Sequence, residues 1–109
     1  MPFDILFGSE VKKISPKEVE ERLRKGDIQI LDVRSEEEYK QGHIPNSINI
    51  PLSELENRLN ELDRSKEIIT VCASGVRSDK AARRLMEMRF DIVKNMSGGM
   101  MAWEGKVVK

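Results

Sequence analysis

Apolar and polar residues alternate along this chain in two different periods. Five short apolar runs, bounded by charged or turn residues, predict strands. These runs span 11–14, 29–33, 47–50, 68–71 and 92–95. Between them, polar and apolar residues follow helical patterns. The helical segments are 16–25, 35–40, 51–63 and 78–89, followed by a short helix that carries Trp103. The alternation predicts a small α/β sheet with helices on both faces.

Capping signals support two of the helix boundaries. Ser15 precedes a proline and stands three residues before Glu18, which predicts a capped helix start with a capping box. Gly26 follows the same helix where a left-handed residue is favoured. Ser53 and Glu56 have the spacing of a second capping box. These positions predict where the helices of 16–25 and 51–63 begin or end.

Length and charge exclude several classes of protein. The 109 residues suit one domain, which we place at 1–109. Lys plus Arg and Asp plus Glu both number 19, so no global charge attracts nucleic acid or an anionic membrane. Residues 1–8 lack a basic segment, and their apolar run is too short for a signal peptide or a membrane span. We therefore expect a cytoplasmic protein, and the oligomeric state stays open.

The lone cysteine, Cys72, lies where the apolar run 68–71 enters a short loop before a helix. Backbone N–H groups of such a loop and of the first helical turn have no internal partners, so they converge on an anion. The residues that would supply them are Ala73, Ser74, Gly75, Val76, Arg77 and Ser78. A cysteine in this setting is expected to be acidic and nucleophilic. Both sulfur and oxyanion chemistry remain open at this point.

Individual loop residues have alternative roles. We expect Gly75 to adopt a positive φ or to allow close approach of an anion. Ser78 is expected to cap the helix, although its hydroxyl can instead donate to the sulfur. Arg77 is expected to brace the loop by pairing with Asp32 or Glu38, the alternative being a charge near the substrate. Further along the helix, three cations could make the rim positive. They are Lys80, Arg83 and Arg84.

Four short motifs follow one another along the chain: Leu31-Asp32-Val33-Arg34 with Glu38-Tyr39, Gly42-His43-Ile44-Pro45 with Asn49-Ile50-Pro51, Cys72 to Ser78, and Gly98-Gly99 with Trp103. In this order they resemble the rhodanese-like family of sulfurtransferase homology domains. They cover about residues 13–103. The resemblance implies a doubly wound parallel sheet and sulfur transfer through a persulfide on Cys72. Asp32 and Arg34, at a neighbouring strand end, would support the site.

The expected reaction takes sulfane sulfur from thiosulfate or a persulfide donor. Since the chain has no second cysteine, the acceptor must be external: a thiol, a cyanide-like molecule or an acceptor protein. Ala73 departs from the basic or polar residue of many active relatives, so the loop side chains do not identify the donor. We expect no cofactor, and one histidine with one cysteine gives no metal-site spacing. His43 is expected to make a structural hydrogen bond, and Trp103 to pack beneath the C-terminal strand.

Two other functions compete with sulfur transfer. A cysteine-dependent phosphatase or arsenate reductase uses a related cradle, but such loops place five residues between cysteine and arginine. Here only four separate Cys72 from Arg77, which favours a smaller bowl suited to sulfur. A non-catalytic docking or sensing module is the other alternative, and the intact cysteine argues against it.

Overall fold

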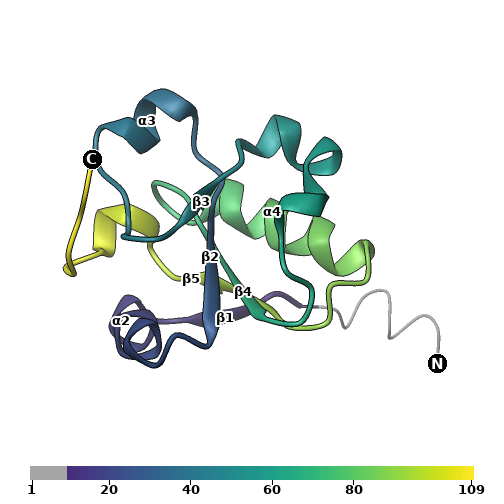
Figure 1. Cartoon of the computed structure of the whole chain (residues 1–109), viewed down its shortest axis with the longest axis horizontal. Coiled ribbons are helices and arrows are strands. Elements are labelled where there is room, and N and C mark those ends of the chain that lie inside the picture. The colour runs from purple at the N-terminus through teal and green to yellow at the C-terminus, as the bar shows by residue number, and fades with distance from the viewer. Residues whose placement is uncertain (1–9) are drawn as a thin grey trace.

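A parallel sheet forms the centre of the computed structural model, which describes residues 10–109 (Figure 1). Five strands lie in the order β1-β5-β4-β2-β3, and each neighbouring pair is parallel. The strands are β1 (Lys12–Ile14), β2 (Ile28–Asp32), β3 (Ile48–Asn49), β4 (Glu67–Val71) and β5 (Val93–Met96). This order places β4 at the centre and confirms the predicted doubly wound parallel sheet.

Helices cover both faces of the sheet. They are α2 (Pro16–Lys25), α3 (Glu36–Lys40), α4 (Val76–Glu87) and the 3-10 helices η1 (Leu52–Asn57), η2 (Leu59–Glu61) and η3 (Gly99–Ala102). Figure 1 shows α2 and the yellow η3 on one side of the sheet, and α4 with η1 on the other. Consecutive strand residues point to opposite faces. Ile68 accordingly packs in the α4 layer and Ile69 in the α2 layer. No helix within residues 10–109 is long and apolar enough to cross a membrane.

The segment 51–63 differs from the predicted helix. It forms η1 and η2, separated by Arg58, whose φ of −129° and ψ of 22° break the helical path. Ser53 lies inside η1 rather than before its first turn, and Pro51 occupies the cap position. The predicted second capping box is therefore wrong, because a capping side chain must precede the first turn. The leucines at 52, 55, 59 and 62 still reach one hydrophobic core.

The other boundaries agree with the sequence to within two residues. Ser15 Oγ accepts a hydrogen bond from Glu18 N at 3.1 Å, and Gly26 ends α2 with a φ of 71°, as expected. The Glu18 side chain does not bond back to the Ser15 backbone, so the expected capping box is only half formed. The strand predicted at 92–95 begins one residue later. The helix predicted to begin at Ser78 begins at Val76. The expectation for residues 1–8 lies outside the described residues.

The sheet brings two predicted site segments together. In the register of β2 and β4, Asp32 lies opposite Val71, so the chain that follows each strand emerges at the same edge. Val33 N donates to Val71 O at 2.9 Å and continues this contact past the end of both strands. Cys72 therefore begins its loop beside Val33 and Arg34, at the carboxyl ends of the central strands, where ligands bind in open α/β sheets.

Candidate active site

The Cys72 sulfur accepts hydrogen bonds from the loop and from α4. Gly75 N–H donates to Cys72 Sγ with an N···S distance of 3.0 Å, and the Ser78 hydroxyl donates with an O···S distance of 3.3 Å. Gly75 has a φ of 108°, the positive value expected for this glycine. Cys72 itself is fully buried, with 0% exposure. The loop therefore holds a sulfur out of water and surrounds it with donors.

The role of Ser78 differs from the helix cap that the sequence led us to expect. Because α4 begins at Val76 with Gly75 at its cap position, Ser78 lies within the first turn and its hydroxyl does not cap the helix. The side chain is instead fully buried against Cys72 Sγ, which was the alternative role. The earlier helix start has a physical cause: glycine at Gly75 permits the left-handed residue that turns the loop directly into the helix.

These contacts determine how readily the Cys72 thiol ionises. Burial opposes the charged form, but hydrogen bonds from Ser78, Gly75 and Ser74 outweigh it and lower the pKa of Cys72 below that of an ordinary thiol. Hydrogen bonds to the charged form stabilise it, and donors in a dry site act strongly. The sulfur is therefore biased towards thiolate, the nucleophilic form of cysteine.

The segment after β5 is hydrogen-bonded to the first residues of the Cys72 loop. Met100 N donates to Cys72 O at 2.8 Å, and Met101 N donates to Ala73 O at 3.0 Å. Gly99 lies so close to this backbone that a Cβ at Gly99 would stand 2.6 Å from the Ala73 carbonyl carbon. Only a residue without a side chain fits there. Sequence reasoning assigned no contact to Gly99, and the consecutive glycines after a strand were the only available signal.

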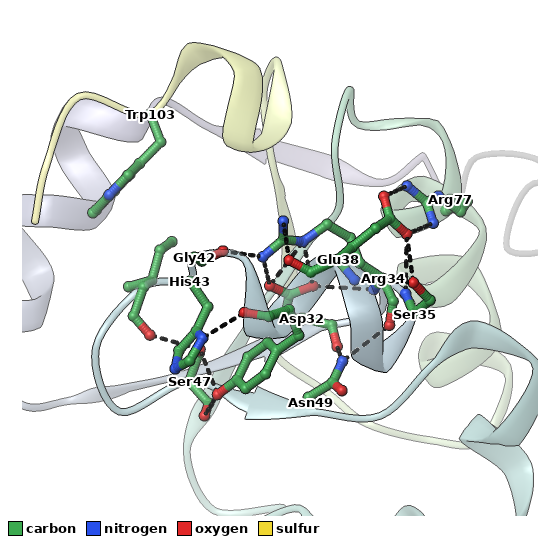
Figure 2. Close-up of polar contacts among 12 residues, drawn as sticks. Asp32, Arg34, Ser35, Glu38, Gly42, His43, Ser47, Asn49, Arg77 and Trp103 are labelled. Carbon is green, nitrogen blue, oxygen red and sulfur yellow. Dashed lines mark hydrogen bonds and ion pairs between the residues drawn. The ribbon is translucent and has the colours of Figure 1, made fainter. Parts of the chain in front are cut away.

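Arg77 braces the loop through Glu38, one of its two expected partners. Its two guanidinium nitrogens lie 2.7 and 2.8 Å from the two carboxylate oxygens of Glu38 (Figure 2). The Arg77 bond lowers the pKa of Glu38 to about 2, assisted by hydrogen bonds from Ser35. Ser35 and Glu38 also form a reciprocal capping box at the start of α3. The ion pair thus joins the first turn of α4 to α3.

Asp32 and Arg34 support the Glu38–Arg77 ion pair indirectly, through α3. Arg34 Nη2 lies 2.7 Å from Asp32 Oδ2 and 2.8 Å from Gly42 O, and the side chains of Asp32 and Arg34 are buried (Figure 2). Arg34 also donates to Glu38 O at 3.3 Å. Within residues 10–109, neither side chain hydrogen-bonds to the loop 72–78. Asp32 therefore orients Arg34, which binds the C-terminal half of α3 and the residue Gly42 beyond it. Glu38 on α3 in turn pairs with Arg77.

His43 and Trp103 make structural contacts, as expected. His43 Nδ1 lies 2.7 Å from Tyr39 O, and the two rings stack with centroids 3.6 Å apart (Figure 2). Tyr39 in turn donates its hydroxyl to Ser47 O at 2.6 Å. Trp103 packs against the buried cluster of the α2 layer and donates its indole N–H to Lys106 O. Sequence reasoning missed the stacking, which joins α3 to the turn before β3.

The three cations of α4 that were expected to make the edge of the Cys72 loop positive are partly neutralised by ion pairs. Arg83 pairs with Asp79, and Arg84 pairs with two glutamates. Lys80 instead lines a hollow of about 430 Å³ beside the loop, together with Lys13 from β1. Of these three cations, only Lys80 has no ion pair within residues 10–109, and it lies at this hollow.

Known proteins match both the sequence and this geometry. The family model for the rhodanese-like domain matches residues 15–106. The chain is 41% identical over 100 residues to the putative sulfur carrier protein YrkF of Bacillus subtilis, covering 91% of this chain but only 54% of that relative. It is 37% identical to the putative sulfurtransferase YtwF of the same organism, covering 89% of this chain and 94% of YtwF.

A solved structure shows the same fold. The rhodanese-related protein of Thermoplasma volcanium superimposes with a TM-score of 0.82 at 33% identity, covering 89% of this chain and 97% of that protein. The family model, the sequence matches and the structural match agree. This chain therefore belongs to the rhodanese-like domain family.

Proposed function

We propose that this chain is a sulfurtransferase that carries sulfane sulfur on Cys72. The observation that carries the proposal is the pair of donors at Cys72 Sγ, the Gly75 N–H at 3.0 Å and the Ser78 hydroxyl at 3.3 Å. Thiolate and persulfide both end in an anionic sulfur. One fixed set of donors can therefore stabilise the resting site and the loaded one without large rearrangement.

The proposed transfer has two steps that each exchange one sulfur–sulfur bond for another. In the first, the Cys72 thiolate attacks the outer sulfur of thiosulfate, a new S–S bond forms, and sulfite leaves with the bonding pair. In the second, an external thiolate attacks the outer sulfur of the Cys72 persulfide, and Cys72 leaves as a thiolate. The charge and electron count balance, so no separate oxidant is needed. A small persulfide replaces thiosulfate in the alternative first step, with its thiolate leaving.

Three observations support sulfur rather than phosphoryl chemistry. Both guanidinium nitrogens that could clamp a tetrahedral oxyanion are engaged by Glu38, at 2.7 and 2.8 Å from Arg77. The names of two relatives, the putative sulfur carrier protein YrkF and the putative sulfurtransferase YtwF, also refer to sulfur carriage and sulfur transfer. Cys72 is also fully buried, and only four residues separate it from Arg77, a short loop that suits one additional sulfur atom better than a phosphoryl group.

Mass spectrometry of the intact protein tests the proposal directly. After incubation with thiosulfate, we expect a gain of one sulfur atom that a thiol acceptor removes and that Cys72→Ala abolishes. Phosphate ester hydrolysis should stay at background. No gain with thiosulfate or with a thiol persulfide would contradict the proposal and favour a non-catalytic docking module. Hydrolysis that depends on Cys72, without persulfide, would favour a phosphatase.

A further inference from the structure

A hollow of about 430 Å³ lies against residues 74–76 of the Cys72 loop. Small-molecule sites occupy roughly 300–1,000 Å³, so its size suits a ligand larger than thiosulfate. It is built from three parts of the fold that are distant in sequence: β1, the start of α4 and the end of β5. The loop that surrounds the sulfur therefore also forms one wall of a separate ligand-sized space.

Two ammonium groups make this hollow positive. Lys13 and Lys80 both line it, and within residues 10–109 neither forms an ion pair with a carboxylate. Asp79 is the one acidic residue of the lining, and its carboxylate is engaged by Arg83 at 2.9 Å. An anionic ligand would thus meet two cations that have no competing carboxylate partner among residues 10–109. Because the two lysines lie on different elements, β1 and α4, they favour a ligand with two separated negative groups.

The hollow is connected to the sulfur through a single loop residue. The Asn95 side chain lines the hollow and donates from Nδ2 to Gly75 O at 3.0 Å. The N–H of the same Gly75 donates to Cys72 Sγ at 3.0 Å. The hollow and the sulfur therefore share Gly75 as a common neighbour, although Cys72 itself is not part of the lining. Ser74 and Ser97 add hydroxyl groups to the same lining.

We propose that this hollow binds the body of a small dicarboxylate thiol, with Lys13 and Lys80 each attracting one carboxylate, and that this thiol accepts sulfur from Cys72. This inference rests on the proposed function. The acceptor is external because the chain has one cysteine, and the hollow offers more room than a donor as small as thiosulfate requires. The acceptor thiolate bonds to the outer persulfide sulfur, and the bond from that sulfur to Cys72 breaks with its electron pair returning to Cys72.

Steady-state transfer from thiosulfate to two matched acceptors tests the site. Mercaptosuccinate carries two carboxylates, and its diamide carries none. In Lys13→Gln and Lys80→Gln, we expect kcat/KM for mercaptosuccinate to fall about fivefold each, the order of strength of an exposed ion pair. The diamide should be unaffected. Each acceptor is compared only between wild type and variant, so the different thiol pKa values of the two acceptors cancel.

Lys12→Gln is the control, since it removes the same charge from the adjacent position of β1 without being part of the lining. We expect Lys12→Gln to leave both acceptors unchanged. An equal loss with mercaptosuccinate and its diamide, or an equal loss in Lys12→Gln, overturns the assignment. If the lysine variants instead slow loading of Cys72 by thiosulfate, the hollow serves the donor and the acceptor assignment is wrong.

Binding without turnover separates this proposal from the proposed function. Methylthiosuccinate has the same two carboxylates but no free thiol. Titration of the wild-type protein should shift the backbone NMR signals of Ser74 and Ser97, and the Lys13→Gln/Lys80→Gln variant should lose this response. Absence of binding to wild type overturns the site. Binding that is lost in the variant, in a protein that forms no Cys72 persulfide, supports the site and contradicts the sulfurtransferase function.

Discussion

Gly99 lies directly against the backbone of Cys72, and a Cβ on Gly99 would collide with the Cys72 carbonyl oxygen. The next two residues, Met100 and Met101, donate their N–H groups to Cys72 O and Ala73 O. The segment after β5 therefore fixes the first residues of the loop. Because these two segments are far apart in the sequence, no local pattern predicts this contact, although the site depends on it.

Gly99→Ala should destabilise the protein by roughly 2–5 kcal/mol, the sum of a left-handed backbone penalty and an overpacked contact. The φ of Gly99 is 59°, and the neighbouring backbone cannot yield easily. Urea unfolding measures the loss, and the rate of Cys72 alkylation reports the loop. Gly26→Ala is the control: its φ is 71°, but nothing lies within 4 Å of the added Cβ. A loss in Gly26→Ala as large as that in Gly99→Ala would contradict the packing argument.

Ser78→Ala should raise the pKa of the Cys72 thiol, because it removes the hydroxyl that donates to Sγ. A hydrogen bond to a charged group is worth about 1.5–3 kcal/mol, so alkylation by iodoacetamide at neutral pH should slow by about tenfold. The pH profile of the alkylation rate should move upward. Ser53→Ala, in η1, serves as a remote control. An unchanged profile in Ser78→Ala would assign the lowered pKa to the backbone donors alone.

The Glu38–Arg77 ion pair should stabilise the protein in a pH-dependent way. The pKa of Glu38 is about 2 in the folded protein against an ordinary 4.5. A lowered folded pKa gives stability that is fully present above 4.5 and is lost as the pH falls towards 2. Because the pair is partly exposed, we expect roughly 1–2 kcal/mol at neutral pH.

Urea unfolding of wild type and Glu38→Gln at a series of pH values measures this contribution. The difference between the two proteins should shrink as the pH falls below about 4.5. Glu37→Gln removes a neighbouring carboxylate from the same helix and should show no such pH-dependent difference. A constant difference between wild type and Glu38→Gln at all pH values would contradict the assigned ion pair.

Arg34→Ala should cost roughly 3–5 kcal/mol of unfolding free energy, because it leaves the buried carboxylate of Asp32 without its partner. Asp32 has 1% exposure and Arg34 has 7%. Arg58→Ala breaks exposed pairs with Glu54 and Glu61 and should cost less than about 1 kcal/mol. Thermal or urea unfolding compares the two. Similar losses would show that burial does not control the strength of the Asp32–Arg34 pair.

Much of the fold could be predicted from the chain because the relevant signals are local. The apolar runs predicted all five strands, and the capping residues Ser15 and Gly26 marked the two ends of α2. The segment 51–63 was misjudged because evenly spaced leucines look the same to a sequence pattern in one α-helix or in two 3-10 helices. There, packing against the α4 layer decided the backbone.

The prediction at Ser78 failed for a related reason. A serine near a helix start can cap the helix or turn inward, and the choice depends on where the helix begins. That position was decided by the left-handed turn at Gly75, so Ser78 faces Cys72 instead of the free amides. Arg77 had two predicted partners, and only the placement of α3 selected Glu38.

Local patterns in the chain were enough to predict the alternation of strands and helices and to place the cysteine at the end of a strand, because periodicity and turn signals act over a few residues. Tertiary structure alone decided which distant groups surround that cysteine. The sheet order brings β5 beside β4, so that Gly99 meets Cys72, and β1 beside β5, so that Lys13 joins Lys80 around one hollow. Such contacts depend on how the whole chain packs, and no local sequence pattern encodes them.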